Sequence, residues 1–289
     1  MHDYTREGAQ GCTSFNEIIA KGYGEPQSAK EFAELEQWVN YDGHRSLFES
    51  RSQNRKGLLM WMSHSCWPSM VWQTYDYYFE PTAAYFAIKK ASEPLHIQWN
   101  PATDEVEVVN YSAGTRKGLT AKVQILNMDG SVAWEKEATV DSNEDTTNKC
   151  IKLAFPVNLS KVHFIKMVLT ENGKVVSDNF YHRSLEENNY QDLRQLAKVA
   201  LQSTTTVDKH ADGTWSAVSV IENKTSTPAL MIRLNVVGNK DGQQLLPVFY
   251  SDNYFSLLPG EKKEVRMSWK DEDTRGNEGK VLITGYNVE

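Results

Sequence analysis

The chain has 289 residues, of which 40% are hydrophobic and 24% are charged, and its formal net charge is −7. This composition is typical of an ordinary soluble globular protein, and the length favours about two domains. The acidic balance argues against a basic nucleic-acid-binding face, and no run approaches the ~18 apolar residues of a membrane helix, so neither nucleic acid nor a membrane is an expected partner.

The first ninety residues have a mainly helical pattern. The opening stretch, "MHDYTREGAQ", has no apolar segment of the kind a signal peptide needs, so the sequence leaves the localisation open. A helix is predicted from Ser28, which forms a capping-box pattern with Glu31 and is followed by apolar residues at helical spacing. Gly43 is a candidate break in this helix.

A strand and a second helix are predicted next. The run "GLLMWM", Gly57 to Met62, is short, apolar and led by glycine, which is typical of a fully buried strand of a parallel sheet. The segment "YDYYFEPTAAYFAIKKASEP" predicts a helix with Pro81 in its first turn and Pro94 at its end. Cys66, between the two elements, is interpreted as a small buried residue because no charge partner is evident.

From Leu95 onward the hydrophobic period falls to two. About seven short strands precede residue 185, and Asp129-Gly130 and Asn172-Gly173 predict hairpin turns, which together favour an immunoglobulin-like β-sandwich. After a polar, partly helical linker, a second set of strands repeats the order of elements. The fold class is therefore mainly β, with domains at 1–92, 93–187 and 196–289.

One strand between two helices cannot form a sheet, because its backbone groups would lack partners. Residues 1–92 are therefore interpreted as the end of a larger (β/α) barrel whose beginning is absent. In a barrel, the loop "SHSCWPSMVWQT" would lie at the C-terminal face, where active sites of TIM barrels are found.

The tryptophan-rich stretch and the helix after it resemble the C-terminal part of family-two glycoside hydrolases. The similar branch holds exo-β-D-glucosaminidases, β-mannosidase-like enzymes and plant-type endo-β-mannosidases. The matching residues are Gly57, Leu58, Trp61, Met62, Trp67, Pro68, Ser69, Trp72, Tyr75, Asp76, Tyr78, Lys89, Lys90, Ala91, Glu93, Pro94, Leu95, His96, Ile97 and Gln98. The resemblance covers nearly the whole chain and implies a (β/α)8 barrel, of which 57–62 would be the last strand, followed by two sandwiches.

The resemblance also implies retaining hydrolysis by two glutamates, an acid on barrel strand four and a nucleophile on strand seven. Neither is expected in this chain. Asn16-Glu17 lies in a predicted helix, and Glu7 falls where the family has the loop after strand seven. The chain is thus predicted to be a C-terminal fragment of a glycosidase for β-linked glucosamine or mannose, inactive alone, with no catalytic residue. No cofactor or metal is implied, and Cys12, Cys66 and Cys150 lack metal spacing.

Three residues are the candidate substrate-binding residues. The resemblance implies that Trp61 floors the sugar site, because an aromatic face suits the C–H face of a pyranose; the alternative is barrel core. His64 stands where glucosaminidase relatives often have asparagine, and it is either a hydrogen-bonding partner of the sugar or an exposed loop histidine. Trp67 lines the pocket or packs under the loop. Asp76 is interpreted as structural, because a carboxylate near the start of the second helix suits the helix dipole. The tyrosine and phenylalanine stripe Tyr78, Tyr85 and Phe86 is interpreted as helix core.

Two other functions stay open, a non-catalytic carbohydrate-binding module and a module that docks on the missing barrel. The expected partners are a β-glucosaminide or β-mannoside and the barrel domain, with self-association through the exposed barrel remnant as an alternative. Residues 1–56 are expected either to be the least ordered part or to pack against the sandwiches or another copy. Relatives of such enzymes are usually periplasmic or secreted.

Overall fold

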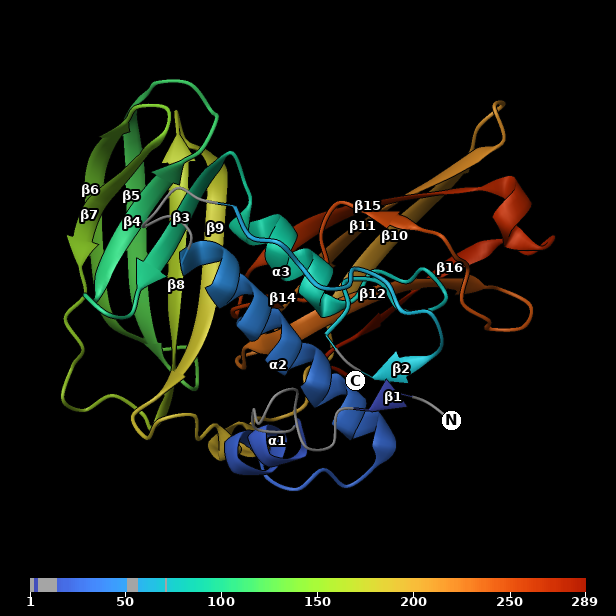
Figure 1. The fold of residues 1–289 in the computed structure, drawn as a ribbon, viewed down its shortest axis with the longest axis horizontal. Coiled ribbons are helices and arrows are strands. Elements are labelled where there is room, and N and C mark those ends of the chain that lie inside the picture. The colour runs from blue at the N-terminus through green and yellow to red at the C-terminus, as the bar shows by residue number, and fades with distance from the viewer. Residues whose placement is uncertain (1–2, 5–14, 51–56, 71) are drawn as a thin grey trace.

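A computed structural model describes residues 3–4, 15–50, 57–70 and 72–289. The fold is mainly β, as predicted. Two β-sandwiches lie side by side, and the helical N-terminal segment lies against both of them (Figure 1). Among the helices in the described ranges, none has the length and apolar character needed to cross a bilayer.

The first sandwich has seven antiparallel strands in two sheets, with orders β3-β4-β7 and β6-β5-β8-β9. The strands are β3 (Leu95–Asn100), β4 (Glu105–Asn110), β5 (Arg116–Asn127), β6 (Val132–Ser142), β7 (Thr146–Lys152), β8 (Val162–Glu171) and β9 (Lys174–Ser184). Alternate residues of β5 are buried, which is the period-two pattern seen in the sequence.

The second sandwich also has seven strands, with sheet orders β10-β11-β15-β13 and β14-β12-β16. The strands are β10 (Gln202–Lys209), β11 (Thr214–Glu222), β12 (Ala229–Gly238), β13 (Phe249–Tyr250), β14 (Phe255–Leu257), β15 (Lys262–Lys270) and β16 (Gly279–Thr284). Two short 3-10 helices, η3 (Gln191–Gln195) and η4 (Asp271–Thr274), lie in the linker and after β15.

The two sandwiches repeat a buried asparagine where their second strand ends. The Asn110 amide donates to the carbonyl of Gly114 at 2.8 Å, and the Asn223 amide donates to that of Thr227 at 2.8 Å. Both side chains are fully buried. Each side-chain amide thus closes the loop that follows it, and the repeated order of elements predicted from the sequence is accompanied by a repeated hydrogen bond.

The described residues of the N-terminal segment form three helices, α1 (Phe15–Tyr23), α2 (Ala29–Ser50) and α3 (Ala83–Ala91). The predicted cap of α2 is present, since the Glu31 amide donates to Ser28 Oγ at 3.1 Å. The expected break at Gly43 is wrong: α2 continues through it, because the helix bonds around it persist and its exposed position needs no side chain. Pro81 lies just before the N-cap of α3, Thr82, rather than in its first turn.

The predicted buried strand at 57–62 is also wrong. These residues have no strand conformation, and Leu59 is fully exposed. Within the described residues, no neighbouring strand offers this run a hydrogen-bonding ladder, and an unpaired apolar run cannot hold a strand alone. Among the described residues, the parallel pairings nearby are those of two two-residue strands, β1 (Asp3–Tyr4) and β2 (Ser69–Met70), and an isolated bridge between His64 and Tyr75.

In the described part of the chain, three clusters of buried side chains form the core. One fills the first sandwich, and a second fills the second sandwich and takes in Phe86 of α3. The third lies between them and joins Leu35 and Trp38 of α2 to Phe164 of β8 and Leu230 of β12. Residues 15–50 therefore pack against both sandwiches, which is the second of the two outcomes expected for them.

Candidate functional site

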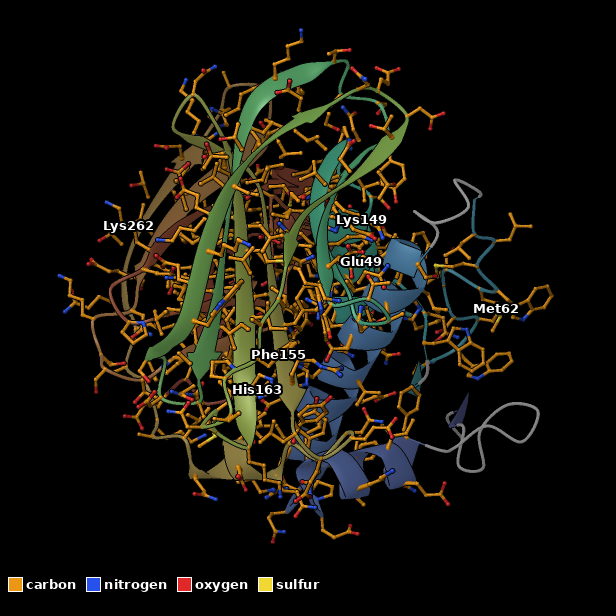
Figure 2. All side chains as sticks on the ribbon, turned by 90° about the vertical axis from the view of Figure 1, so that its left-hand side faces the viewer. Glu49, Met62, Lys149, Phe155, His163 and Lys262 are labelled. Carbon is orange, nitrogen blue, oxygen red and sulfur yellow. The ribbon has the colours of Figure 1, made fainter. Side chains whose placement is uncertain are left out.

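Residues 57–82, here called the aromatic loop, carry the three candidate sugar-binding residues. Trp61 is 80% exposed and Trp67 is 52% exposed, while His64 is half-buried. Figure 2 shows the loop around Met62 projecting from the body of the molecule, on the far side of α2 from the first sandwich. Trp61 therefore does not pack in a core, and the rings of Trp61 and Trp67 are both accessible to a ligand.

Apart from the two-residue strand β2, hydrogen bonds within the loop take the place of regular secondary structure. The Tyr75 amide and the Thr74 hydroxyl both donate to the carbonyl of Ser63, at 3.0 and 2.9 Å. The Trp72 indole N–H donates to the carbonyl of Trp61 at 2.6 Å. These bonds fix the backbone that carries Trp61, although its ring remains in solvent.

His64 is held by a second turn of the same loop. Its ring stacks on Phe79 with 4.6 Å between ring centroids, and its Nε2 lies 3.4 Å from the carbonyl of Tyr77. Phe79 has a φ of 68°, a left-handed conformation that an aromatic residue rarely adopts. Among the described residues, no ring contact joins Trp67 to Trp61 or to His64, so the structure does not gather the three candidates into one closed pocket.

Asp76 has the structural role that the sequence predicted, but through a turn rather than a helix dipole. Its Oδ1 accepts hydrogen bonds from the amides of Tyr78 and Glu80 at 2.8 and 2.9 Å. Burial raises the pKa of Asp76 above its ordinary value, against the two amide bonds that lower it.

Two further expectations about the loop are wrong. Cys66 is exposed rather than buried, because the strand expected to pack beside it is missing. Tyr78 is 59% exposed and does not join Phe86 in the core, since it lies in the turn before α3 rather than on the helix.

A cleft of about 300 Å³ lies behind the loop, between α2 and the second sandwich. Its walls mix aromatic and charged side chains, including Trp38, Asp76, Glu80, Arg233 and Tyr254. Arg233 forms an ion pair with Glu80, so this wall joins the aromatic loop to β12.

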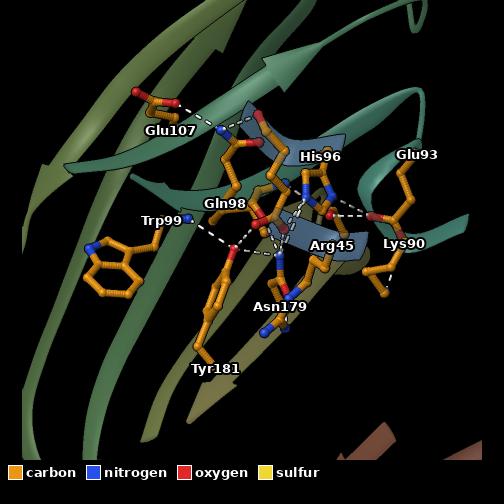
Figure 3. A network of polar contacts seen from close by, with 12 residues as sticks. Arg45, Lys90, Glu93, His96, Gln98, Trp99, Glu107, Asn179 and Tyr181 are labelled. Atoms are coloured by element: carbon orange, nitrogen blue, oxygen red, sulfur yellow. Dashed lines mark hydrogen bonds and ion pairs between the residues drawn. The ribbon is translucent and has the colours of Figure 1, made fainter. Parts of the chain in front are cut away.

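A buried polar network, which the sequence reasoning missed, ties α2 to the first sandwich (Figure 3). His96 is fully buried, with Nε2 3.1 Å from Glu49 and Nδ1 3.2 Å from Glu93. Glu49 also accepts hydrogen bonds from the Asn179 amide at 2.8 Å and the Tyr181 hydroxyl at 2.9 Å. Burial lowers the pKa of His96, but the two carboxylates outweigh it, so the pKa is raised overall.

The sequence carried one signal for this network. Asp42, Arg45 and Glu49 lie on one face of α2, a polar set on the side that packs against β9. Arg45 donates to Asn179 at 3.1 Å, and its guanidinium lies 4.1 Å from the centroid of the Tyr181 ring. Polar residues on the buried face of a helix require partners, so the pattern predicts a polar interface although it does not identify the partners.

The structure describes one of the two glutamates considered as catalytic candidates. Glu17 lies in the first turn of α1, as the sequence predicted, and Glu7 lies outside the described residues. No group of three or more histidine, cysteine, aspartate or glutamate side chains in the described part of the chain has a metal-binding arrangement.

Comparisons with known proteins find similarity to exo-β-D-glucosaminidases. Residues 179–288, from β9 to the C-terminal end of the second sandwich, match the family model of the exo-β-D-glucosaminidase Ig-fold domain. An exo-β-D-glucosaminidase of Hypocrea jecorina is 30% identical over 95% of this chain and 34% of its own length, and one of Streptomyces avermitilis is 31% identical over the same shares. The chain thus spans about a third of the length of these curated relatives.

Solved structures agree with the sequence comparison. An Amycolatopsis orientalis exo-chitosanase has a TM-score of 0.90 at 29% identity, with 96% of this chain and 36% of that chain covered. A β-D-mannosidase from Dictyoglomus thermophilum has a TM-score of 0.72 at 18% identity, covers 99% of this chain and 33% of that chain, and shows the same fold.

Proposed function

We propose that this chain, a homologue of the exo-β-D-glucosaminidases and β-mannosidases of glycoside hydrolase family 2, is the C-terminal part of a retaining glycosidase for β-linked glucosamine or mannose. Residues 1–92 are the last part of its (β/α)8 barrel, and 93–187 and 196–289 are two sandwiches. The catalytic acid and nucleophile lie on the rest of the barrel, so this chain supplies sugar contacts and no catalytic glutamate.

The exposed aromatic loop carries this proposal. Two tryptophans that are more than half exposed would bury apolar surface against a ligand, and a pyranose presents a flat C–H face to such rings. His64, which stacks on Phe79 in the same loop, adds a hydrogen-bonding group. Aromatic faces with one or two fixed polar groups are the usual means by which a protein site combines affinity with orientation.

The test is a titration of the purified chain with glucosamine and mannose oligosaccharides, followed by tryptophan fluorescence and calorimetry. Trp61→Ala and Trp67→Ala are each expected to weaken binding about 5- to 30-fold, because each removes a stacking surface worth roughly 1–2 kcal/mol. Phe249→Ala is the matched control, since Phe249 on the second sandwich has an exposure between those of the two tryptophans. Unchanged affinity in both tryptophan variants would remove the loop from the sugar site.

A hydrolysis assay tests whether the catalytic glutamates lie outside this chain. The purified chain is expected not to hydrolyse aryl β-glucosaminides or β-mannosides. Clear turnover would refute the proposal that both catalytic glutamates lie outside this chain. The intact mass and N-terminal sequence of the native protein then distinguish the two remaining functions. A native protein with the rest of a barrel ahead of these residues supports the glycosidase, and one without it supports a carbohydrate-binding or docking module.

A further inference from the structure

We propose that Arg233, on the second sandwich, is the positioning residue that holds His64 of the aromatic loop in its sugar-contacting orientation. The inference rests on the proposed function, because it concerns the same loop, and it assigns the second sandwich a role in sugar recognition. Arg233 itself touches no sugar; it acts through the turn at 76–80.

Arg233 is placed to anchor that turn. It lies on β12, and its guanidinium forms an ion pair with Glu80 while lying 5.8 Å from the centroid of the Tyr254 ring. The pair is partly buried, with 28% of the Arg233 side chain and 16% of the Glu80 side chain exposed. An ion pair in these surroundings is screened less than one on the surface, so it restrains the loop more strongly.

Glu80 is the last residue of a tight turn whose other end is Asp76. The Asp76 amide donates to the carbonyl of Glu80 at 3.0 Å, and the Glu80 amide donates back to Asp76 Oδ1 at 2.9 Å. The Phe79 amide closes the turn on the carbonyl of Asp76 at 3.2 Å. Holding Glu80 therefore fixes the backbone at Phe79, directly before it.

The left-handed conformation of Phe79 makes this anchor necessary. A non-glycine residue with a φ of 68° persists only where the surroundings determine its conformation. Its ring is 60% exposed, so core packing does not hold it. The exposed side chain of Phe79 is nevertheless the surface on which His64 stacks, at 4.6 Å. Losing the anchor would let Phe79 return to a common conformation and would displace the His64 ring.

The first measurement is made on the full chain without sugar. In the ¹H–¹³C correlation spectrum of the imidazole groups, the His64 signals are assigned from a His64→Gln variant. Arg233→Met is expected to shift and broaden these signals. Arg233→Lys is expected to cause a smaller change, because lysine keeps the positive charge but lacks the planar guanidinium group. Arg266→Met is the matched control, since Arg266 pairs with Glu264 on the exposed face of the same sandwich.

The second measurement is the affinity for glucosamine oligosaccharides. Arg233→Met is expected to weaken binding about 2- to 30-fold, a range typical of residues that act through a contact chain. Glu80→Gln should give the same loss, and the double variant no further loss, because both break one link. Glu80→Gln also replaces Arg233→Met if the latter does not fold, as judged by circular dichroism.

The outcomes separate the inference from the proposed function. An unliganded His64 spectrum that is identical in the wild type, Arg233→Met and Glu80→Gln overturns the role of Arg233, whatever the chain binds. A shifted spectrum in a chain that binds no sugar keeps the positioning of His64 and overturns the proposed function. Equal effects of Arg266→Met and Arg233→Met would reduce the result to a general loss of charge and would also overturn the inference.

Discussion

His96 lies between two carboxylates from different parts of the chain, Glu49 on α2 and Glu93 after α3. Around this set stand the Asn179 amide, the Tyr181 hydroxyl and the ammonium of Lys90, which pairs with Glu93 at 2.9 Å. A charged imidazole satisfies both carboxylates at once, whereas a neutral one can donate to only one of them. The docking of α2 on the first sandwich therefore depends on a proton held by a buried residue.

Stability should consequently fall at alkaline pH. The folded-state pKa of His96 is raised above its unfolded value, so its stabilisation is fully present below the unfolded pKa and is lost as pH rises through the folded pKa. We expect the free energy of unfolding, measured in urea from pH 6 to 9, to decrease less steeply in His96→Gln than in the wild type. His210→Gln, at an exposed histidine, should follow the wild type. Parallel curves for wild type and His96→Gln would show that His96 does not hold the proton.

Glu36 shows the opposite case of a buried carboxylate on the same helix. It is 3% exposed, its Oε1 has no hydrogen-bond partner among the described residues, and burial raises the pKa of Glu36 to about 7. Because the raised pKa favours the protonated form in the folded state, the destabilisation grows as pH rises from about 4.5 and is complete above about 7. Its size is about 3 kcal/mol, at 1.36 kcal/mol for each pKa unit between 4.5 and about 7.

Glu36→Met should therefore stabilise the protein, by up to about 3 kcal/mol at pH 8 and by less at pH 5. Chemical denaturation at the two pH values measures the difference. Glu49→Met is the control on the same helix: Glu49 is buried too but is hydrogen-bonded, so its loss should destabilise at both pH values. If Glu36→Met raised the free energy of unfolding equally at both pH values, the ionised carboxylate of Glu36 would not be the cause of the destabilisation.

Helix α2 contains a glycine, Gly43, although its helical conformation does not require a glycine there. Gly43 is exposed, and a Cβ built on it would meet no atom within 4 Å. Gly43→Ala is expected to raise the free energy of unfolding by about 0.5–1 kcal/mol, because alanine loses less backbone entropy in a helix. Gly279→Ala is expected to lower the free energy of unfolding, since the added Cβ would lie 2.7 Å from the Trp269 ring. Thermal unfolding of both variants tests the pair, and a destabilised Gly43→Ala would contradict it.

Elements whose structure is set locally were predictable from the sequence. The hairpin at Asn172-Gly173 formed because both residues adopt positive φ, at 51° and 76°, which their types permit. The strand predicted from Gly57 to Met62 is wrong, because an apolar pattern alone does not specify a strand when no partner strand is there to pair with it. The buried polar network around His96, here called the clamp, also depends on partners far apart in the chain. Glu49 is 47 residues from His96, and no spacing rule joins a helix face to a distant strand.

Helix α2 joins the two sandwiches, so the described residues form one body. The helix places Leu35 and Trp38 in the cluster between the sandwiches, and it places Glu49 in the clamp on the first sandwich. The sandwiches also meet directly, through the ion pair of Lys166 with Glu261. Because α2 packs on both sandwiches, its local unfolding would expose part of each sandwich. The free energy of opening α2 should therefore approach the free energy of unfolding of the whole molecule.

Native-state hydrogen exchange tests this coupling. Amides of α2 from Leu35 to Glu49 should exchange about as slowly as those of β5 and β12, whereas amides of the aromatic loop should exchange faster, because their bonds lie at the surface. Glu49→Ala should speed exchange in α2 and leave both sandwich cores unchanged, since it breaks the clamp but not the sheets. Slow exchange in the sandwiches together with fast exchange in wild-type α2 would show that the helix opens independently. The clamp at His96 would then contribute little to the fold, and the pH dependence expected from it should vanish as well.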